Sequence, residues 1–100
     1  MKYLELIQTY LRNEKLLVFP QKRKPRIACL IFISKQFKTN QLYTLEDLEK
    51  IIKDNILFSE IESLKKELIV NKFLSFDKEK NAYIKEKKQP KFDEYGFKED

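Results

Sequence analysis

The chain has 100 residues, of which 42% are hydrophobic and 37% are charged, and its formal net charge is +5. A chain of this length holds a single modest core, so two domains are not expected. The longest apolar run has seven residues, far short of the roughly 20 that cross a bilayer. The start, "MKYLELIQTY", also lacks the apolar stretch of a signal peptide. We therefore expect a cytoplasmic protein with no membrane partner.

The composition also excludes several kinds of catalytic site. The sequence has no histidine, so it offers no imidazole base, no Cys/His nucleophile pair and no zinc site of the usual kind. Its single glycine, Gly96, excludes a glycine-rich loop around phosphate. Its single cysteine, Cys29, lies in an apolar run, which favours a buried hydrophobic role over a reactive thiol. We expect no enzymatic activity, no cofactor and no metal site.

The first elements in chain order are two helices separated by an extended segment. An amphipathic helix is predicted over residues 2–12, because apolar residues recur there at helical spacing. These residues are Tyr3, Leu4, Ile7, Tyr10 and Leu11. "KLLVFP" follows as an extended segment that ends at Pro20. Residues 26–37 contain no turn signal, which predicts a helix buried on most sides. A polar loop then leads to a short extended segment at residues 42–43.

Two further helices are predicted from capping boxes. In a capping box, the side chain of the N-cap residue and the side chain three residues later each accept a hydrogen bond from a free backbone amide at the helix start. Thr44 and Asp47 form the first box, and Ser59 and Glu62 match the pattern more closely. The second of these helices should end near Asn71. The carboxylates of the first of these two helices have neither a partner base nor other metal ligands nearby in the sequence, so we interpret them as a solvated helix face. They are Glu46, Asp47 and Glu49.

A β-hairpin is predicted over residues 74–85, around a polar turn at residues 78–81, with Phe76 and Tyr83 placed to pair across it. Helix, short strand, helix, turn, helix and hairpin is the element order of a winged helix-turn-helix. We therefore expect an α+β, mainly α fold of this type. It would carry an extra N-terminal helix and a C-terminal β-hairpin wing.

The domain is expected over residues 1–85, followed over residues 86–100 by a charged and flexible tail. The tail also contains three aromatic residues, Phe92, Tyr95 and Phe97. A second interpretation therefore stays open, in which these rings dock on the domain or on another copy of the chain.

The same segments resemble a known family. "FPQKRKPRIACLIFISKQFKTNQLYT", followed by "LKKEL" and "FLSFD", is similar to the prokaryotic domain of unknown function 2087, which occurs alone or attached to transcriptional regulators. The resemblance covers about residues 14–85, and its most specific part is a spaced set of residues. They are Phe19, Pro20, Lys22, Arg23, Lys24, Phe37, Tyr43 and Thr44. The resemblance supports the fold and, by association only, a link to transcription.

Two positions match the family less directly, and three features depart from it. One departure is the stretch "NILFSE" before the third helix, where the family has a stretch that contains His and Asp. Lys65 and Lys66 stand where the family usually carries two arginines. Glu49 stands where an asparagine is common, and Lys72 where a glycine often turns the chain. Any family activity that used those groups is in doubt for this chain.

The positive charge is concentrated in one region. Between residues 15 and 38 lie seven basic residues and no acidic one. Four of them form a dense cluster, made of Lys22, Arg23, Lys24 and Arg26. If Pro25 is the first residue of the buried helix, these cations lie at the positive end of the helix dipole, where each costs about 0.3–1 kcal/mol at low salt. Phosphate would relieve that cost, although a cluster that simply points into water is the open alternative.

We therefore predict a small nucleic-acid-binding module, with DNA favoured over RNA and a role in transcription regulation. Its contacts would be the basic cluster with Lys65 and Lys66, although Lys65 lies nearer the buried face, where its stem packs on the core. The third helix offers few residues that read base edges, so sequence-specific reading is expected to be weak. The alternative is a non-enzymatic protein-interaction or dimerisation module of a regulator, whose partner is a regulator protein or a second copy.

Overall fold

The structure is a computed structural model and describes residues 3–96. The chain begins with helix α1 (Tyr3–Gln8) and a small antiparallel hairpin, β1 (Leu11–Arg12) and β2 (Lys15–Leu16). The helix predicted over residues 2–12 is therefore too long. The helix ends at Gln8, because Leu11 and Arg12 pair with Leu16 and Lys15 across a turn at Asn13 and Glu14, whose φ angles of 51° and 65° are left-handed.

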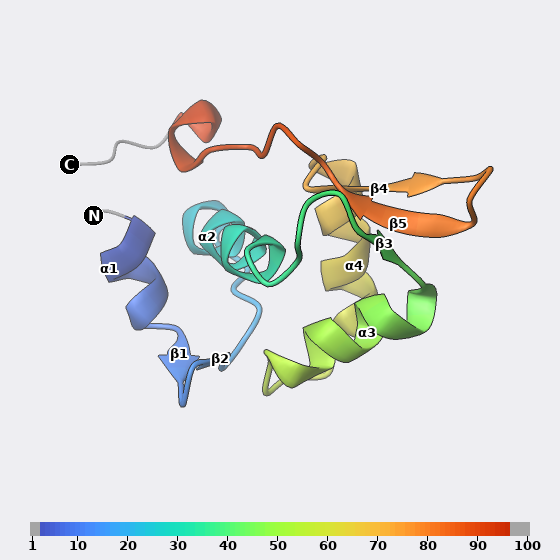
Figure 1. The fold of residues 1–100 in the computed structure, drawn as a ribbon. Coiled ribbons are helices and arrows are strands. Elements are labelled where there is room, and N and C mark those ends of the chain that lie inside the picture. The colour runs from blue at the N-terminus through green and yellow to red at the C-terminus, as the bar shows by residue number, and fades with distance from the viewer. Residues whose placement is uncertain (1–2, 97–100) are drawn as a thin grey trace.

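Helix α2 (Arg23–Ser34) forms the centre of the domain, with α1 on one side and α4 on the other (Figure 1). The expected burial is confirmed, because most of its residues lie in the core. Cys29 is fully buried, as predicted. Ser34 is the one polar core side chain among the described residues, and its Oγ donates to the carbonyl of Ile31 at 2.8 Å.

A short strand, β3 (Leu42–Tyr43), leads into helix α3 (Leu45–Asp54). The predicted capping box is confirmed. The Thr44 hydroxyl accepts from the amide of Asp47 at 3.1 Å, and the Asp47 carboxylate accepts from the amide of Thr44 at 3.4 Å. Leu48 and Ile52 are the buried residues of the helix.

Helix α4 (Ile61–Val70) buries Leu64 and Leu68 and is capped at its end by Asn71, where the sequence places it. The predicted box at its start is wrong. The N-cap is Glu60, one residue later than Ser59, and no side chain caps the helix there. A one-residue shift moves Glu62 out of the third helical position from which it could reach back to the N-cap amide.

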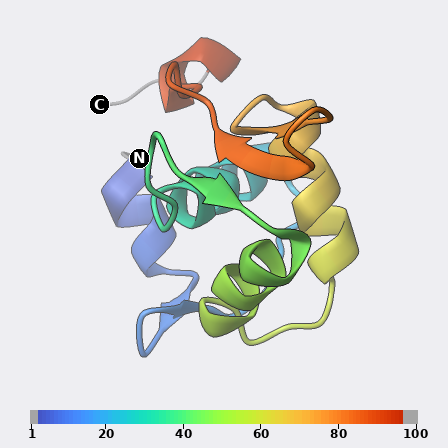
Figure 2. The ribbon, with the colours of Figure 1, turned by 45° about the vertical axis from the view of Figure 1, so that its right-hand side comes forward.

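Strands β4 (Leu74–Asp77) and β5 (Ala82–Lys85) form the predicted hairpin, with Phe76 opposite Tyr83 and their ring centroids 4.9 Å apart. Strand β3 adds to β5, so the antiparallel sheet has the order β3-β5-β4. Figure 2 shows the hairpin beside the α3–α4 pair. Helices α2, α3 and α4 with this sheet and wing confirm the α+β, winged-helix-like architecture.

The N-terminal arm is tied to the connection between α3 and α4. The amide of Leu16 donates to the carbonyl of Asn55 at 2.9 Å, and the amide of Leu57 donates to the carbonyl of Leu16 at 2.8 Å. These bonds form an isolated parallel bridge between Leu16 and Ile56, both of which are buried. The segment before α2 is thus part of the same core.

The chain after β5 returns above α2 towards α1 and ends in a 3-10 helix, η1 (Phe92–Tyr95) (Figure 1). The tail therefore packs on the domain over residues 86–96, which differs from the flexible tail expected from the sequence. Phe92 is 5% exposed, and its ring meets that of Tyr3 edge-on at a centroid distance of 6.2 Å. The alternative interpretation, in which the aromatic rings of the tail dock on the domain, describes this segment better. Phe97 lies outside the described residues.

Within residues 3–96, none of the helices has the length and apolar character that a bilayer span requires.

Candidate nucleic-acid interface

The cluster Lys22, Arg23, Lys24 and Arg26 lies at the start of α2. Lys22 is the N-cap, with extended backbone and no side-chain cap, and the helix begins at Arg23. The expectation that Pro25 opens the helix is wrong by two residues, because proline is tolerated anywhere in a first turn whose amides have no helical acceptor. The first intrahelical bond runs from the amide of Arg26 to the carbonyl of Lys22 at 3.0 Å.

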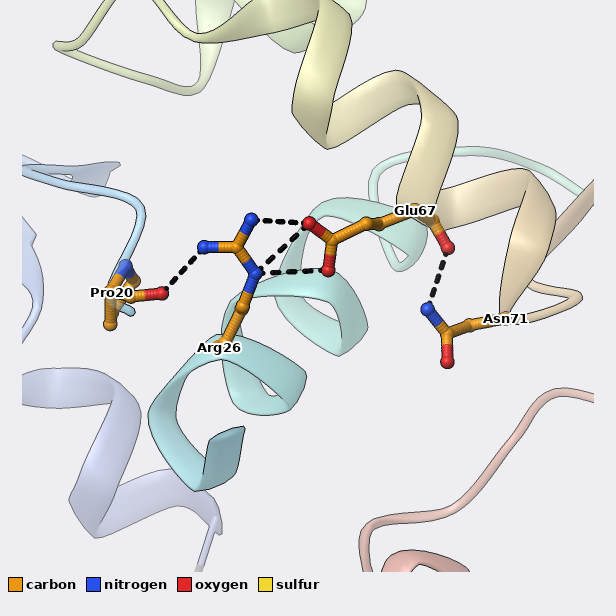
Figure 3. Close-up of polar contacts among 4 residues, drawn as sticks. All are labelled: Pro20, Arg26, Glu67 and Asn71. Carbon is orange, nitrogen blue, oxygen red and sulfur yellow. Dashed lines mark hydrogen bonds and ion pairs between the residues drawn. The ribbon is translucent and has the colours of Figure 1, made fainter. Parts of the chain in front are cut away.

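Arg26 is committed to contacts within its own chain (Figure 3). Its Nε lies 2.9 Å from both carboxylate oxygens of Glu67 on α4, and its Nη2 also binds Oε2 of Glu67. Its Nη1 donates to the carbonyl of Pro20 at 2.8 Å, and the guanidinium lies 3.7 Å from the ring centroid of Phe19. The hydrogen bond with Glu67 raises the pKa of Arg26. Arg26 is therefore a structural residue rather than a free phosphate contact.

Arg23 and Lys24 lie over rings of the tail. The Arg23 guanidinium is 5.4 Å from the ring centroid of Tyr95, and the Lys24 ammonium is 5.7 Å from that of Phe92. A cation over a ring keeps its charge and its outward N–H groups. Lys22 is exposed. The structure thus keeps three cations together on the uncapped first turn of α2.

The two predicted lysines of α4 differ in role. Lys65 is 13% exposed at its side chain and pairs with Glu49 at 2.9 Å and Glu62 at 3.0 Å. Burial acts to lower the pKa of Lys65, but its hydrogen bonds to both carboxylates outweigh burial and raise it. Lys66, in contrast, is exposed. Only Lys66 remains a candidate contact on this helix.

The acidic residues of α3 are also structural. Asp47 belongs to the capping box, and hydrogen bonding to Lys65 lowers the pKa of Glu49. The solvated face inferred from the sequence therefore holds for Glu46, which is exposed and has no salt bridge within residues 3–96. Glu49 thus serves as an acidic partner of Lys65 across the α3–α4 pair.

Sequence reasoning missed the partners that hold the cluster. Glu67 lies 41 residues from Arg26 in the chain, so no local pattern joins them. Tyr95 and Phe92 had a weak signal, because aromatic residues in a charged tail are a reason to expect docking.

A family model matches residues 15–85 of the chain, which is most of its length. The family is described as an uncharacterized protein conserved in bacteria. No curated protein and no solved structure matches the chain. The matched residues contain α2, the β3-β5-β4 sheet and the α3–α4 pair, and exclude α1 and η1. The chain therefore belongs to DUF2087, a bacterial family of uncharacterized proteins.

Proposed function

We propose that this protein is a small, non-enzymatic nucleic-acid-binding module that acts in transcription, with duplex DNA favoured over RNA. The observation that carries the proposal is the gathering of Lys22, Arg23 and Lys24 at the uncapped start of α2 on a winged-helix scaffold. Proteins with that scaffold commonly bind DNA through helices and wing. The fold alone does not imply function, so the argument rests on the charges.

The phosphate contacts are Lys22, Arg23 and Lys24. Cations at a helix start oppose the dipole, and the structure offers no acidic residue in the first turn of α2 to offset them. A phosphate there would gain the three charges together with free amides of the turn. The set is smaller than the sequence predicts, because Arg26 and Lys65 are occupied by carboxylates of the same chain.

Lys66 adds a cation on α4, the helix that corresponds to the recognition helix of this architecture. The exposed positions of α4 also include Glu62, Ser63 and Val70. Acids repel phosphate, and valine offers no hydrogen bond to a base edge. Binding should therefore depend mainly on the backbone of the nucleic acid, with little sequence preference and a strong dependence on salt.

The test is fluorescence anisotropy with a labelled random duplex and a labelled single strand at two salt concentrations. The variant combines Lys22→Gln, Arg23→Gln and Lys24→Gln, and its matched control combines Lys87→Gln, Lys88→Gln and Lys91→Gln. We expect the first variant to bind the duplex at least tenfold more weakly at low salt. Its log–log salt slope should become shallower by about 0.9 for each phosphate that the variant no longer neutralises.

The melting temperature of this variant should stay close to the parent value, because none of the three side chains belongs to the buried core. Unchanged duplex binding by the variant would contradict the proposal, as would an equally weakened control.

The exposed face of α4 favours a second candidate, a protein-interaction module of a regulator. Val70 is 66% exposed, and Glu62 and Ser63 lie on the same exposed surface. Such a mixed face is more typical of protein contact than of contact with phosphate. Size-exclusion chromatography with light scattering, on the full chain and on a version that ends at Lys85, tests self-association. A monomer in both cases would exclude self-association, both through this face of α4 and through the tail.

A further inference from the structure

A hollow of about 920 Å³ lies at the opposite end of α2 from the basic cluster. Three segments form its walls: the start of α1, the last turn of α2, and the chain from the end of β5 onward, residues 85–93. Its volume is at the upper end of the range for small-molecule sites, about 300–1,000 Å³. The tail therefore not only covers α2 but also completes a space large enough for a ligand.

The hollow has an apolar side. Tyr3, Leu4, Ile31, Pro90 and Phe92 line it. Leu4 is 66% exposed at its edge, whereas Ile31 and Phe92 are buried. An aliphatic or aromatic body that covers this side would remove apolar surface from water, which favours binding.

The hollow also has a basic side, made of five lysines: Lys35, Lys85, Lys87, Lys88 and Lys91. Among residues 3–96, two carboxylates share the lining, those of Glu5 and Asp93. Within residues 3–96, none of the five lysines forms an ion pair with a carboxylate. The positive charge at this site is therefore not neutralised by the part of the chain that the structure describes.

Two of these lysines are held in place by neutral partners. Lys85 Nζ donates to the carbonyl of Phe37 at 3.0 Å, and Lys35 Nζ lies 4.5 Å from the ring centroid of Tyr3. Burial lowers the pKa of Lys85, and the charge of Lys35 lowers it further. An anion beside them would reverse both effects, because it favours the charged form of each lysine.

We propose that this hollow binds a free, fatty-acid-like carboxylate, with its apolar chain against Tyr3, Ile31 and Phe92 and its head group among the lysines. A neutral apolar molecule would leave the lysines unmatched, and a polyanion such as nucleic acid would leave the apolar side unused. The carboxylate would form charge-assisted hydrogen bonds with ammonium groups, which are about twice as strong as neutral ones. This site adjoins the proposed nucleic-acid contacts at Phe92, whose ring lies 5.7 Å from the Lys24 ammonium, but its own lysines are different ones and the proposal does not depend on nucleic-acid binding.

The test is isothermal titration of the full chain with decanoate below its micellar concentration. Decanol tests the need for the charge, and butyrate tests the need for the chain. We expect saturable binding of one decanoate, at least tenfold weaker binding of decanol, and no measurable binding of butyrate. No saturable decanoate binding, or decanol binding as tight as that of decanoate, would overturn the proposal.

Two pairs of variants locate the site. The combination Lys87→Gln, Lys88→Gln and Lys91→Gln should weaken decanoate at least tenfold, whereas Lys50→Gln, Lys78→Gln and Lys80→Gln, on α3 and the wing tip, should not. Leu4→Asp should weaken decanoate at least tenfold, whereas Val70→Asp, at a position that is equally 66% exposed, should leave it unchanged. All these positions are exposed, so circular-dichroism melting should confirm that each variant folds.

Equal losses within either pair would overturn the assignment, because they would indicate unspecific attraction. A pelleting assay with vesicles of anionic phospholipid separates the free carboxylate from a membrane surface. Binding to the vesicles without binding of monomeric decanoate would also overturn it.

Discussion

Arg26 and Glu67 join the first turn of α2 to the middle of α4 through three hydrogen bonds between a guanidinium and a carboxylate. Their side chains are 26% and 28% exposed, so the pair is partly shielded from water. The same guanidinium also holds the carbonyl of Pro20 and covers the ring of Phe19. One arginine thus fixes the entry of α2, the segment before it and the helix that crosses it.

The pair should be energetically coupled. Arg26→Gln and Glu67→Gln should each destabilise the fold, and the double variant should lose less than the sum, with a coupling of about 1–2 kcal/mol. Urea unfolding of the four proteins in a double-mutant cycle measures this coupling. The matched cycle on Lys65 and Glu62 should show no resolvable coupling, because the Glu62 side chain is 80% exposed. Equal coupling in both cycles would contradict the structural role of Arg26.

The two helix starts of the α3–α4 pair should respond differently to loss of a hydroxyl. Thr44→Ala removes the acceptor for the amide of Asp47 and should cost about 1 kcal/mol. Ser59→Ala should stay within about 0.5 kcal/mol, because no side chain caps α4. Thermal unfolding of both variants checks the difference. A larger loss for Ser59→Ala would mean that α4 starts one residue earlier.

The thiol of Cys29 should make stability fall in alkali. Burial raises its pKa from 9.0 to about 12, so the unfolded chain releases this proton at a lower pH than the folded one. The stabilisation is therefore complete below pH 9 and is lost as the pH rises towards 12. Between pH 8 and pH 10 the free energy of unfolding should fall by about 1.4 kcal/mol because of this thiol.

Denaturant unfolding of the parent chain and of Cys29→Ala at both pH values isolates this effect from the titration of tyrosines and lysines. The parent should lose about 1.4 kcal/mol more than the variant over that interval. Parallel pH profiles would show that the thiol does not contribute.

The tail, residues 86–96, should stabilise the fold mainly through the buried ring of Phe92. Phe92→Ala removes a side chain that is 5% exposed and should cost about 2–3 kcal/mol, somewhat below a central core position because the tail can detach locally. Phe76→Ala, at a wing position that is 41% exposed, should cost less than about 1 kcal/mol. Calorimetric unfolding compares the two. Similar costs would show that the tail is not anchored by Phe92.

The parts of the fold that follow from local rules were predictable from the sequence. The Thr44–Asp47 box, the strand before it and the hairpin with Phe76 opposite Tyr83 each depend on residues close together in the chain. The central helix followed from its unbroken apolar run.

The remaining features depend on contacts between distant segments. Tyr10 and Leu11 fit a helical pattern, yet the chain turns after them through two non-glycine residues with positive φ. Lys72 also has a φ of 65°, and a lysine gives no turn signal. For the site, the sequence located the cations but could not reveal which of them meet a carboxylate. The partner of Arg26 is brought there only when α2 and α4 pack.

The edge-on contact between Tyr3 and Phe92 brings the two ends of the described chain together. A short linker could therefore join those ends, and the chain could be reopened at the exposed wing tip, residues 78–81, without separating any core segments. A domain with this arrangement tolerates circular permutation and insertion into a surface loop of another protein.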